Sequence, residues 1–129
     1  MLDANRSREV VNKVEAELLT PMGLRSLSPR DPKYVPRYIG SPHDRDAGYH
    51  QGTVWAWLIG AFVDAYRLVH AKDNGVDARI AEILAGFESH ISEAMLGQVS
   101  EIFDAHWPHY PRGCAAQAWS VAELLRVSE

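Results

Sequence analysis

The hydrophobic positions of this chain recur at helical spacing in four separate segments. In residues 6–19 the apolar side chains fall at i, i+4 and i+8, and in residues 76–96 they keep a period close to 3.6. Residues 53–72 begin with an uncharged run and end before Gly75, and residues 115–127 carry a broad apolar face. The pattern predicts four helices and no strand, since no segment alternates clearly between apolar and polar residues.

The four predicted helices differ in how much of their surface is apolar. Residues 6–19 and 76–96 have a charged side, which is typical of helices in an outer layer. The helix at 53–72 opens with the uncharged run 54–63, which is typical of an inner helix. This alternation predicts an all-α protein built from stacked inner and outer helical hairpins, as in part of an α/α toroid. We expect residues 1–129 to form a single domain.

Two long connections, residues 20–52 and 97–114, interrupt the helices. Both are rich in proline, glycine and aromatic residues, and connections of this length are usually functional loops. Each precedes a helix of the inner type, so both are expected to open at the same end of the bundle. That arrangement would gather polar and aromatic side chains at one mouth, among them Tyr49, His50, Gln51, Glu101 and Asp104.

Composition narrows the classes of protein that remain. The chain has 129 residues, 47% of them hydrophobic and 23% charged, with a formal net charge of −4 and a pI near 5.8. It shows no basic run for nucleic acid, and its longest uncharged run is too short to span a membrane. One cysteine and a charged N-terminus without an apolar signal region lead us to expect a cytoplasmic protein. No nucleotide-binding glycine motif is present, and we expect no cofactor.

Acidic residues beside aromatic residues in loops are typical of carbohydrate sites, because aromatic faces stack on sugar rings and carboxylates act as acid and base. Glu101 lies directly before Ile102-Phe103, so its carboxylate sits among apolar neighbours. The alternative for Glu101 is a surface residue or a salt bridge at a helix end. His50 is equally compatible with a substrate donor and with a helix cap.

Two other kinds of site, a metal site and a catalytic cysteine, are disfavoured by the residues around them. His106 and His109, with Asp104, have the spacing of metal ligands, but Pro108 lies between the histidines and argues against the helix that would align them. Cys114 has no clear catalytic partners, so a small buried residue is the preferred interpretation. We therefore expect no metal site.

Four segments carry motifs that can be compared with a known family: MGLRSLSPRDPKYVPRYIG, YHQGTVWAWLIGAFVDAY, SEIFDAHWPHYPRGC and AQAWSVAELLR. In this order, from about residue 20 to 126, they resemble the C-terminal end of the glucosidase domain of glycogen debranching enzymes, the amylo-α-1,6-glucosidase module. The resemblance implies an (α/α)6 toroid that removes the α-1,6-linked glucose at a branch point with inversion. Inversion requires two carboxyls separated by roughly 6.5–9.5 Å.

The resemblance also implies roles for individual residues. Glu101 matches the position of the general base. Arg25 and Ser26, and the region of His50, Gln51 and Trp55, resemble walls of the sugar pocket, with Tyr49 and Asp104 beside them. Gln117 and Trp119 resemble the inner helix behind the base, in a supporting role. Branched α-glucan or an oligosaccharide is the implied partner.

The chain differs from the family pattern at several positions, and these differences lower the activity that we expect of it. Ala56 and Ala105 stand where the family usually has proline and glycine, and nothing corresponds to the general-acid aspartate. Four helices match only the last third of such a barrel, so we expect a fragment or truncated homologue that is inactive alone. Its uncovered apolar flanks predict a homo-oligomer or a complementary chain. The alternative is a noncatalytic helical module that binds glucan or protein.

Overall fold

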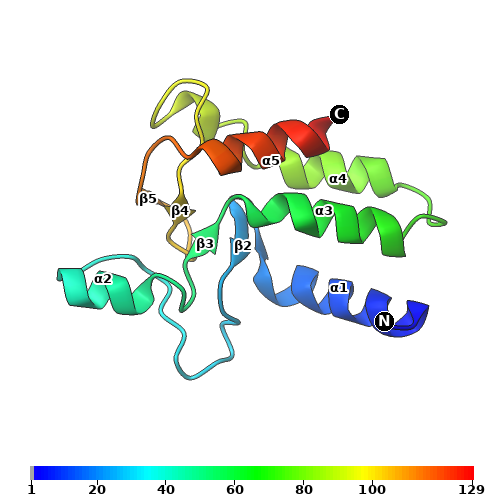
Figure 1. The fold of residues 1–129 in the computed structure, drawn as a ribbon, viewed down its shortest axis with the longest axis horizontal. Helices are drawn as coiled ribbons and strands as arrows, with labels where there is room; N and C mark the ends of the chain where they lie inside the picture. The colour runs from blue at the N-terminus through cyan, green and yellow to red at the C-terminus, as the bar shows by residue number, and fades with distance from the viewer. Residues whose placement is uncertain (1) are drawn as a thin grey trace.

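A computed structural model describes residues 2–129 of the chain (Figure 1). Five α-helices occur along it, together with one 3-10 turn at His90–Ser92: α1 (Ala4–Leu18), α2 (Pro42–Gly48), α3 (Leu58–Val69), α4 (Val76–Ala85) and α5 (Ala118–Ser128). Five short strands join them: β1 (Leu19–Thr20), β2 (Gly23–Arg25), β3 (Val54–Trp55), β4 (Ile102–Phe103) and β5 (Pro111–Arg112).

The predicted all-α class is wrong. The chain folds as an α+β protein, because the five strands pair into one antiparallel sheet in the order β1-β2-β3-β4-β5. The prediction of four helices stacked as hairpins of a partial (α/α)6 toroid fails with it. Each strand has only two or three residues, which is too short for apolar and polar positions to show a visible alternation.

Two of the predicted helices are too long. The apolar run expected to open an inner helix at residue 53 begins instead as β3, and α3 starts only at Leu58. The helix expected over residues 76–96 ends at Ala85, because its periodic core positions stop at Phe87. Beyond that point Ile91 and Met95 continue the period in the sequence but are exposed.

The sheet draws its strands from widely separated parts of the chain. Leu24 of β2 lies opposite Trp55 of β3, which in turn lies opposite Ile102 of β4. Val54, Ile102 and Phe103 are completely buried. Ile102 and Phe103 are neighbours on one strand and point to opposite faces, so both faces of the sheet are covered at this point. Both long connections predicted as loops are therefore tied to one sheet.

The hydrophobic core lies between the sheet and the long helices. Figure 1 shows α1, α3, α4 and α5 stacked to one side of the sheet, with the short α2 beyond its other side. Helix α3 packs against both α1 and α5 and contributes the buried side chains Ile59, Phe62 and Val63. The 3-10 turn adds His90, whose ring meets Phe103 of β4 edge-on at a centroid distance of 4.7 Å.

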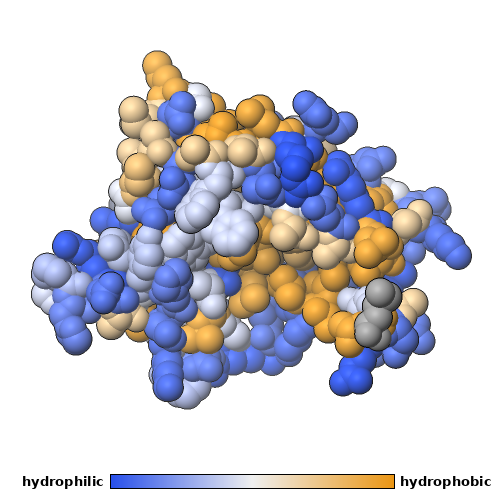
Figure 2. Space-filling model, viewed as in Figure 1, coloured by the Kyte–Doolittle hydropathy of each residue, from blue (hydrophilic) through white to orange (hydrophobic). Residues whose placement is uncertain are grey.

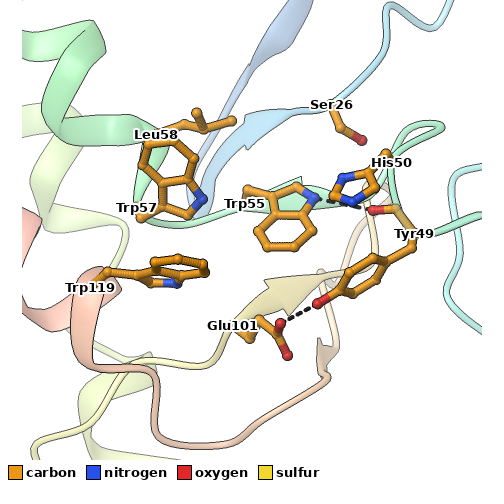
Figure 3. A pocket seen from close by; sticks show the side chains of 8 residues that line it. All are labelled: Ser26, Tyr49, His50, Trp55, Trp57, Leu58, Glu101 and Trp119. Carbon is orange, nitrogen blue, oxygen red and sulfur yellow. Dashed lines mark hydrogen bonds between the residues drawn. The ribbon is translucent and has the colours of Figure 1, made fainter.

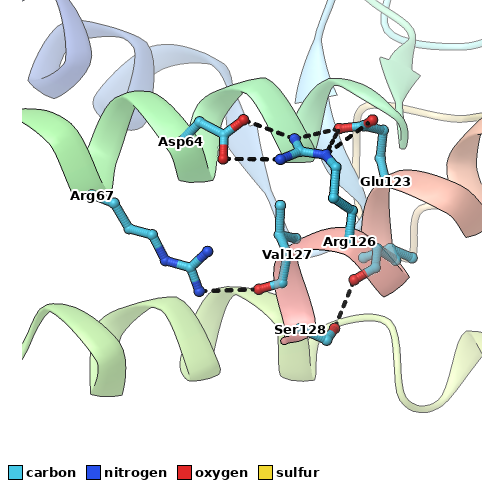
Figure 4. A network of polar contacts seen from close by, with 7 residues as sticks. Asp64, Arg67, Glu123, Arg126, Val127 and Ser128 are labelled. Atoms are coloured by element: carbon cyan, nitrogen blue, oxygen red, sulfur yellow. Dashed lines mark hydrogen bonds and ion pairs between the residues drawn. The ribbon is translucent and has the colours of Figure 1, made fainter.

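A polar network ties α5 to α3 at the surface (Figure 4). The Arg126 guanidinium donates to both carboxylate oxygens of Asp64, at 3.1 and 2.8 Å, and also to Glu123. Arg67 donates to the carbonyl of Val127 at 3.1 Å. These contacts link the last turns of α5 to α3, and the first turn of α5 carries Trp119. Within residues 2–129, no helix has the length and apolar character needed to cross a membrane.

Candidate functional site

A pocket of about 510 Å³ opens at the end of the sheet where the two long connections meet (Figure 3). Five of its eight lining residues carry aromatic or imidazole rings, and one carries a carboxylate. We call it the aromatic pocket, and its lining consists of Ser26, Tyr49, His50, Trp55, Trp57, Leu58, Glu101 and Trp119.

One wall of the aromatic pocket is a group of three packed rings. The imidazole of His50 lies almost parallel to the indole of Trp55, with centroids 5.0 Å apart and an angle of 8° between the planes. Tyr49 meets Trp55 edge-on at 4.8 Å, and the Trp55 indole N–H donates to the Tyr49 carbonyl at 3.2 Å. These contacts fix three ring orientations without any ligand.

A tight segment before β3 positions these rings. The Thr53 hydroxyl donates to the Tyr49 carbonyl at 2.6 Å, and the Gly52 N–H donates to the Ser26 hydroxyl at 2.9 Å. His50 is exposed in this segment and precedes β3, whereas α3 begins at Leu58. The helix-cap alternative for His50 is therefore wrong, and its ring is free to face a ligand.

Two tryptophans form the opposite part of the lining. Trp57, just before α3, and Trp119, in the first turn of α5, have ring centroids 5.9 Å apart and planes tilted by 37°. Trp119 is 51% exposed, so much of its ring remains available for contact. The expectation that Trp119 only supports the pocket from behind misses this exposure, because the sequence does not show where α5 begins relative to the sheet.

Glu101 precedes β4 and has both carboxylate oxygens held by hydrogen bonds. The Tyr49 hydroxyl donates to Oε1, and the Cys114 N–H donates to Oε2 at 2.9 Å. The Glu101 N–H in turn donates to the Cys114 carbonyl at 2.9 Å, which closes the hairpin of β4 and β5 below the side chain. The carboxylate is thereby fixed at the pocket rather than left free at the surface.

Glycine at position 113 makes room for this carboxylate. Gly113 has φ +66°, and a Cβ at that position would collide with Oε2 of Glu101. Sequence reasoning missed both Gly113 and Cys114 as residues that hold Glu101. Cys114, expected to be a small buried residue, is exposed and acts here through its backbone.

The two hydrogen bonds leave Glu101 able to accept further hydrogen bonds. An ionised carboxylate offers about four acceptor positions, and only two are occupied here. Burial, with the hydrogen bond to Glu101 as a second cause, raises the pKa of Tyr49 above its ordinary value, so the phenol stays a neutral donor. The arrangement can hold a water molecule or a hydroxyl group against an oriented carboxylate.

Three residues expected to contact sugar do not line the aromatic pocket. The Arg25 side chain donates to backbone carbonyls of residues 17, 19 and 105. Asp104 is buried and forms a forked ion pair with Arg112, while also accepting the Tyr38 N–H at 2.9 Å. Gln51 contributes backbone hydrogen bonds to the segment before β3. Sugar contact by Arg25, Gln51 and Asp104 stays a prediction without support from this pocket.

The histidines considered as metal ligands have other partners. His109 Nδ1 lies 2.9 Å from the carbonyl oxygen of Asp104, and His106 packs against the Tyr34 ring. Over the described residues 2–129, no three histidine, cysteine, aspartate or glutamate side chains are grouped so that they could hold a metal ion.

Comparison with known proteins gives the family of the chain. The family model described as amylo-alpha-1,6-glucosidase matches residues 1–126. A glycogen debranching enzyme of Saccharomyces cerevisiae is 28% identical in an alignment 124 residues long, and this alignment covers 81% of the present chain. The match spans only 8% of the length of that relative. The chain belongs to the amylo-alpha-1,6-glucosidase family.

Proposed function

We propose that the aromatic pocket binds a glucosyl residue of a branched α-glucan and that Glu101 is the general base of an inverting α-1,6-glucosidase reaction. The observation that carries this proposal is the carboxylate of Glu101, which is held by Tyr49 and Cys114 at the edge of an aromatic pocket. Flat apolar rings suit the C–H faces of a sugar, and the oriented carboxylate suits a water that attacks the anomeric carbon.

The lining of the aromatic pocket supplies only one of the two carboxyl groups that the reaction uses. Glu101 is the one carboxylate among the eight lining residues, whereas inverting hydrolysis uses a second carboxyl as general acid. Loss of general-acid assistance lowers a rate by about 10²–10⁴-fold. We therefore propose that these 129 residues release no measurable glucose by themselves and that the acid comes from a complementary polypeptide segment.

Tryptophan fluorescence tests the binding half of the proposal. Three of the four tryptophans line the pocket, and the fourth, Trp107, does not and is 84% exposed. Titration with a branched limit dextrin should change the emission of the wild-type chain. Trp119→Ala should weaken binding, and the control Trp107→Ala should leave it unchanged. Equal effects of the two substitutions, or no response to dextrin at all, would contradict the proposed pocket.

Glu101→Gln separates a general base from a residue that merely binds sugar. A base acts in the transition state, so this variant should keep its dextrin affinity within about threefold. The alternative function, a noncatalytic glucan-binding module, is favoured by the predominance of rings over carboxylates in the lining. It predicts that Glu101→Gln loses dextrin affinity by more than about tenfold, which corresponds to one charged hydrogen bond.

Glucose release provides the second readout. We expect no release from limit dextrin with either the wild-type chain or Glu101→Gln. Release by the wild-type chain that is lost in Glu101→Gln would support the base and overturn the requirement for a complementary segment. Release that persists in Glu101→Gln would overturn the role of Glu101.

A further inference from the structure

An apolar groove of about 410 Å³ runs along α1 and α3 and ends at β2. We call it the α1–α3 groove. Apart from Arg25 and Ser26, every residue that lines it is apolar, and the argument uses Val10 and Val14 of α1 and Leu58, Ala61 and Ala65 of α3. Figure 2 shows the hydrophobic surface that gathers over this part of the molecule, where α1 and α3 lie.

The shape of the groove suits a helix. Val10 and Val14 stand one turn apart on α1, and Ala61 and Ala65 stand one turn apart on α3. The alanines leave space between the two helix backbones, and Val10 is 48% exposed and Ala61 is exposed. A third helix could lay a stripe of apolar side chains along this line at i, i+4 and i+7 spacing.

The inner end of the groove carries a positive charge without a counter-ion. Within residues 2–129 the Arg25 guanidinium forms no ion pair, and its recorded acceptors are three backbone carbonyls at 3.2–3.3 Å. Its Nε is buried and has no hydrogen-bond partner. The nearby Glu17 carboxylate is turned instead toward Lys13, Arg30 and Ser28.

The groove is continuous with the aromatic pocket. Ser26 and Leu58 line both cavities, so an element seated in the groove would form part of the pocket rim. Its end beside Arg25 would lie next to the aromatic pocket, whose lining holds a single carboxylate.

We propose that the α1–α3 groove is the docking site of an amphipathic helix from outside these 129 residues, with an apolar stripe on α1 and α3 and a carboxylate paired with Arg25. Apolar burial supplies the attraction along the groove, and the unneutralised guanidinium selects a negatively charged end. This interaction surface does not depend on the role proposed for Glu101, so either proposal can fail alone.

Synthetic peptides of about 18 residues, long enough to hold helical structure, are the probe. Each is built from alanine and glutamine with leucines at i, i+4 and i+7, and it carries either glutamate or glutamine one turn beyond the last leucine. We expect the glutamate peptide to bind about tenfold more tightly than the glutamine peptide in calorimetric titration, and high salt to reduce the difference. Arg25→Glu should reverse the preference toward a peptide with lysine at that position.

Two matched substitutions locate the binding. Ala61→Trp fills the groove from an exposed position and should abolish binding of both peptides. Ala78→Trp, on an exposed position of α4 outside the groove, should leave binding unchanged. The peptide comparison needs no change in the protein, so it stays decisive even if Arg25→Glu fails to fold.

Several results would overturn the proposal. Equal affinity for the glutamate and glutamine peptides would remove the role of Arg25. Binding that survives Ala61→Trp would place the peptide elsewhere. Light scattering that shows a dimer, with dissociation in Ala61→Trp but not in Ala78→Trp, would make a second copy of this chain the occupant instead.

Discussion

Replacing Gly113 by alanine tests how strictly the backbone positions Glu101. Gly113 has φ +66°, a left-handed conformation that costs a residue with a Cβ about 1 kcal/mol. The added Cβ also collides with Oε2 of Glu101, so the carboxylate must leave the Cys114 N–H. A hydrogen bond to a charged group contributes about 1.5–3 kcal/mol. We therefore expect Gly113→Ala to lower the free energy of unfolding by about 3 kcal/mol in urea denaturation.

Gly97→Ala is the matched control for this prediction. Gly97 has a similar φ, +71°, but a Cβ placed there meets no described atom within 4 Å. The control should lose only the conformational part, about 1 kcal/mol, and keep its dextrin binding. Equal losses of stability in the two variants would refute the link between Gly113 and the carboxylate.

Three further predictions concern buried ionisable groups. Burial lowers the pKa of His90 below its ordinary 6.5, so the unfolded chain takes up the proton before the folded chain as the pH falls. The free energy of unfolding should therefore decrease between pH 7 and pH 5 in urea denaturation. His90→Gln should make this decrease smaller. Arg112→Met leaves the buried Asp104 carboxylate unpaired and should cost about 3 kcal/mol of unfolding free energy by the same method; a loss near zero would contradict the importance of the pair. Burial raises the pKa of Tyr49, so it should be the last phenol to ionise in an ultraviolet titration, and Tyr49→Phe should remove that last step; a last step that survives the substitution would contradict its assignment to Tyr49.

Helical periodicity predicted where helices lie but not how the layers form. The expected start of a helix at Val76 agrees with α4, because Gly75 adopts φ +82° and ends the preceding turn. The uncharged run from Val54 predicts a buried helix, but a buried strand is uniformly apolar too, so the pattern does not distinguish the two. Only its pairing with Ile102 and Phe103, far along the chain, makes it a strand. Such pairing leaves no mark within the local sequence.

Some features of the candidate site could likewise be predicted from the sequence, and others could not. The proximity of Tyr49, His50 and Glu101 follows from both loops opening at one end of the fold, and the structure places all three in one pocket. The family resemblance places Arg25 and Ser26 together in the pocket wall, yet strand geometry sends neighbouring side chains to opposite faces, and only Ser26 lines the pocket. The support from Gly113 runs through the backbone, and residue types alone do not disclose it.

The five-stranded sheet makes the pocket a property of the whole chain. Its lining extends from Ser26 to Trp119, so no peptide shorter than residues 26–119 contains all of it. Pairing Leu24 with Trp55, and Trp55 with Ile102, closes two long loops. Closing them costs chain entropy, and packing of the sheet must offset this cost before the rings of the pocket can come together. A sugar that binds only the closed sheet would stabilise every helix packed on it by mass action. Amide hydrogen exchange in α4, none of whose residues lines the pocket, should then slow as dextrin is added.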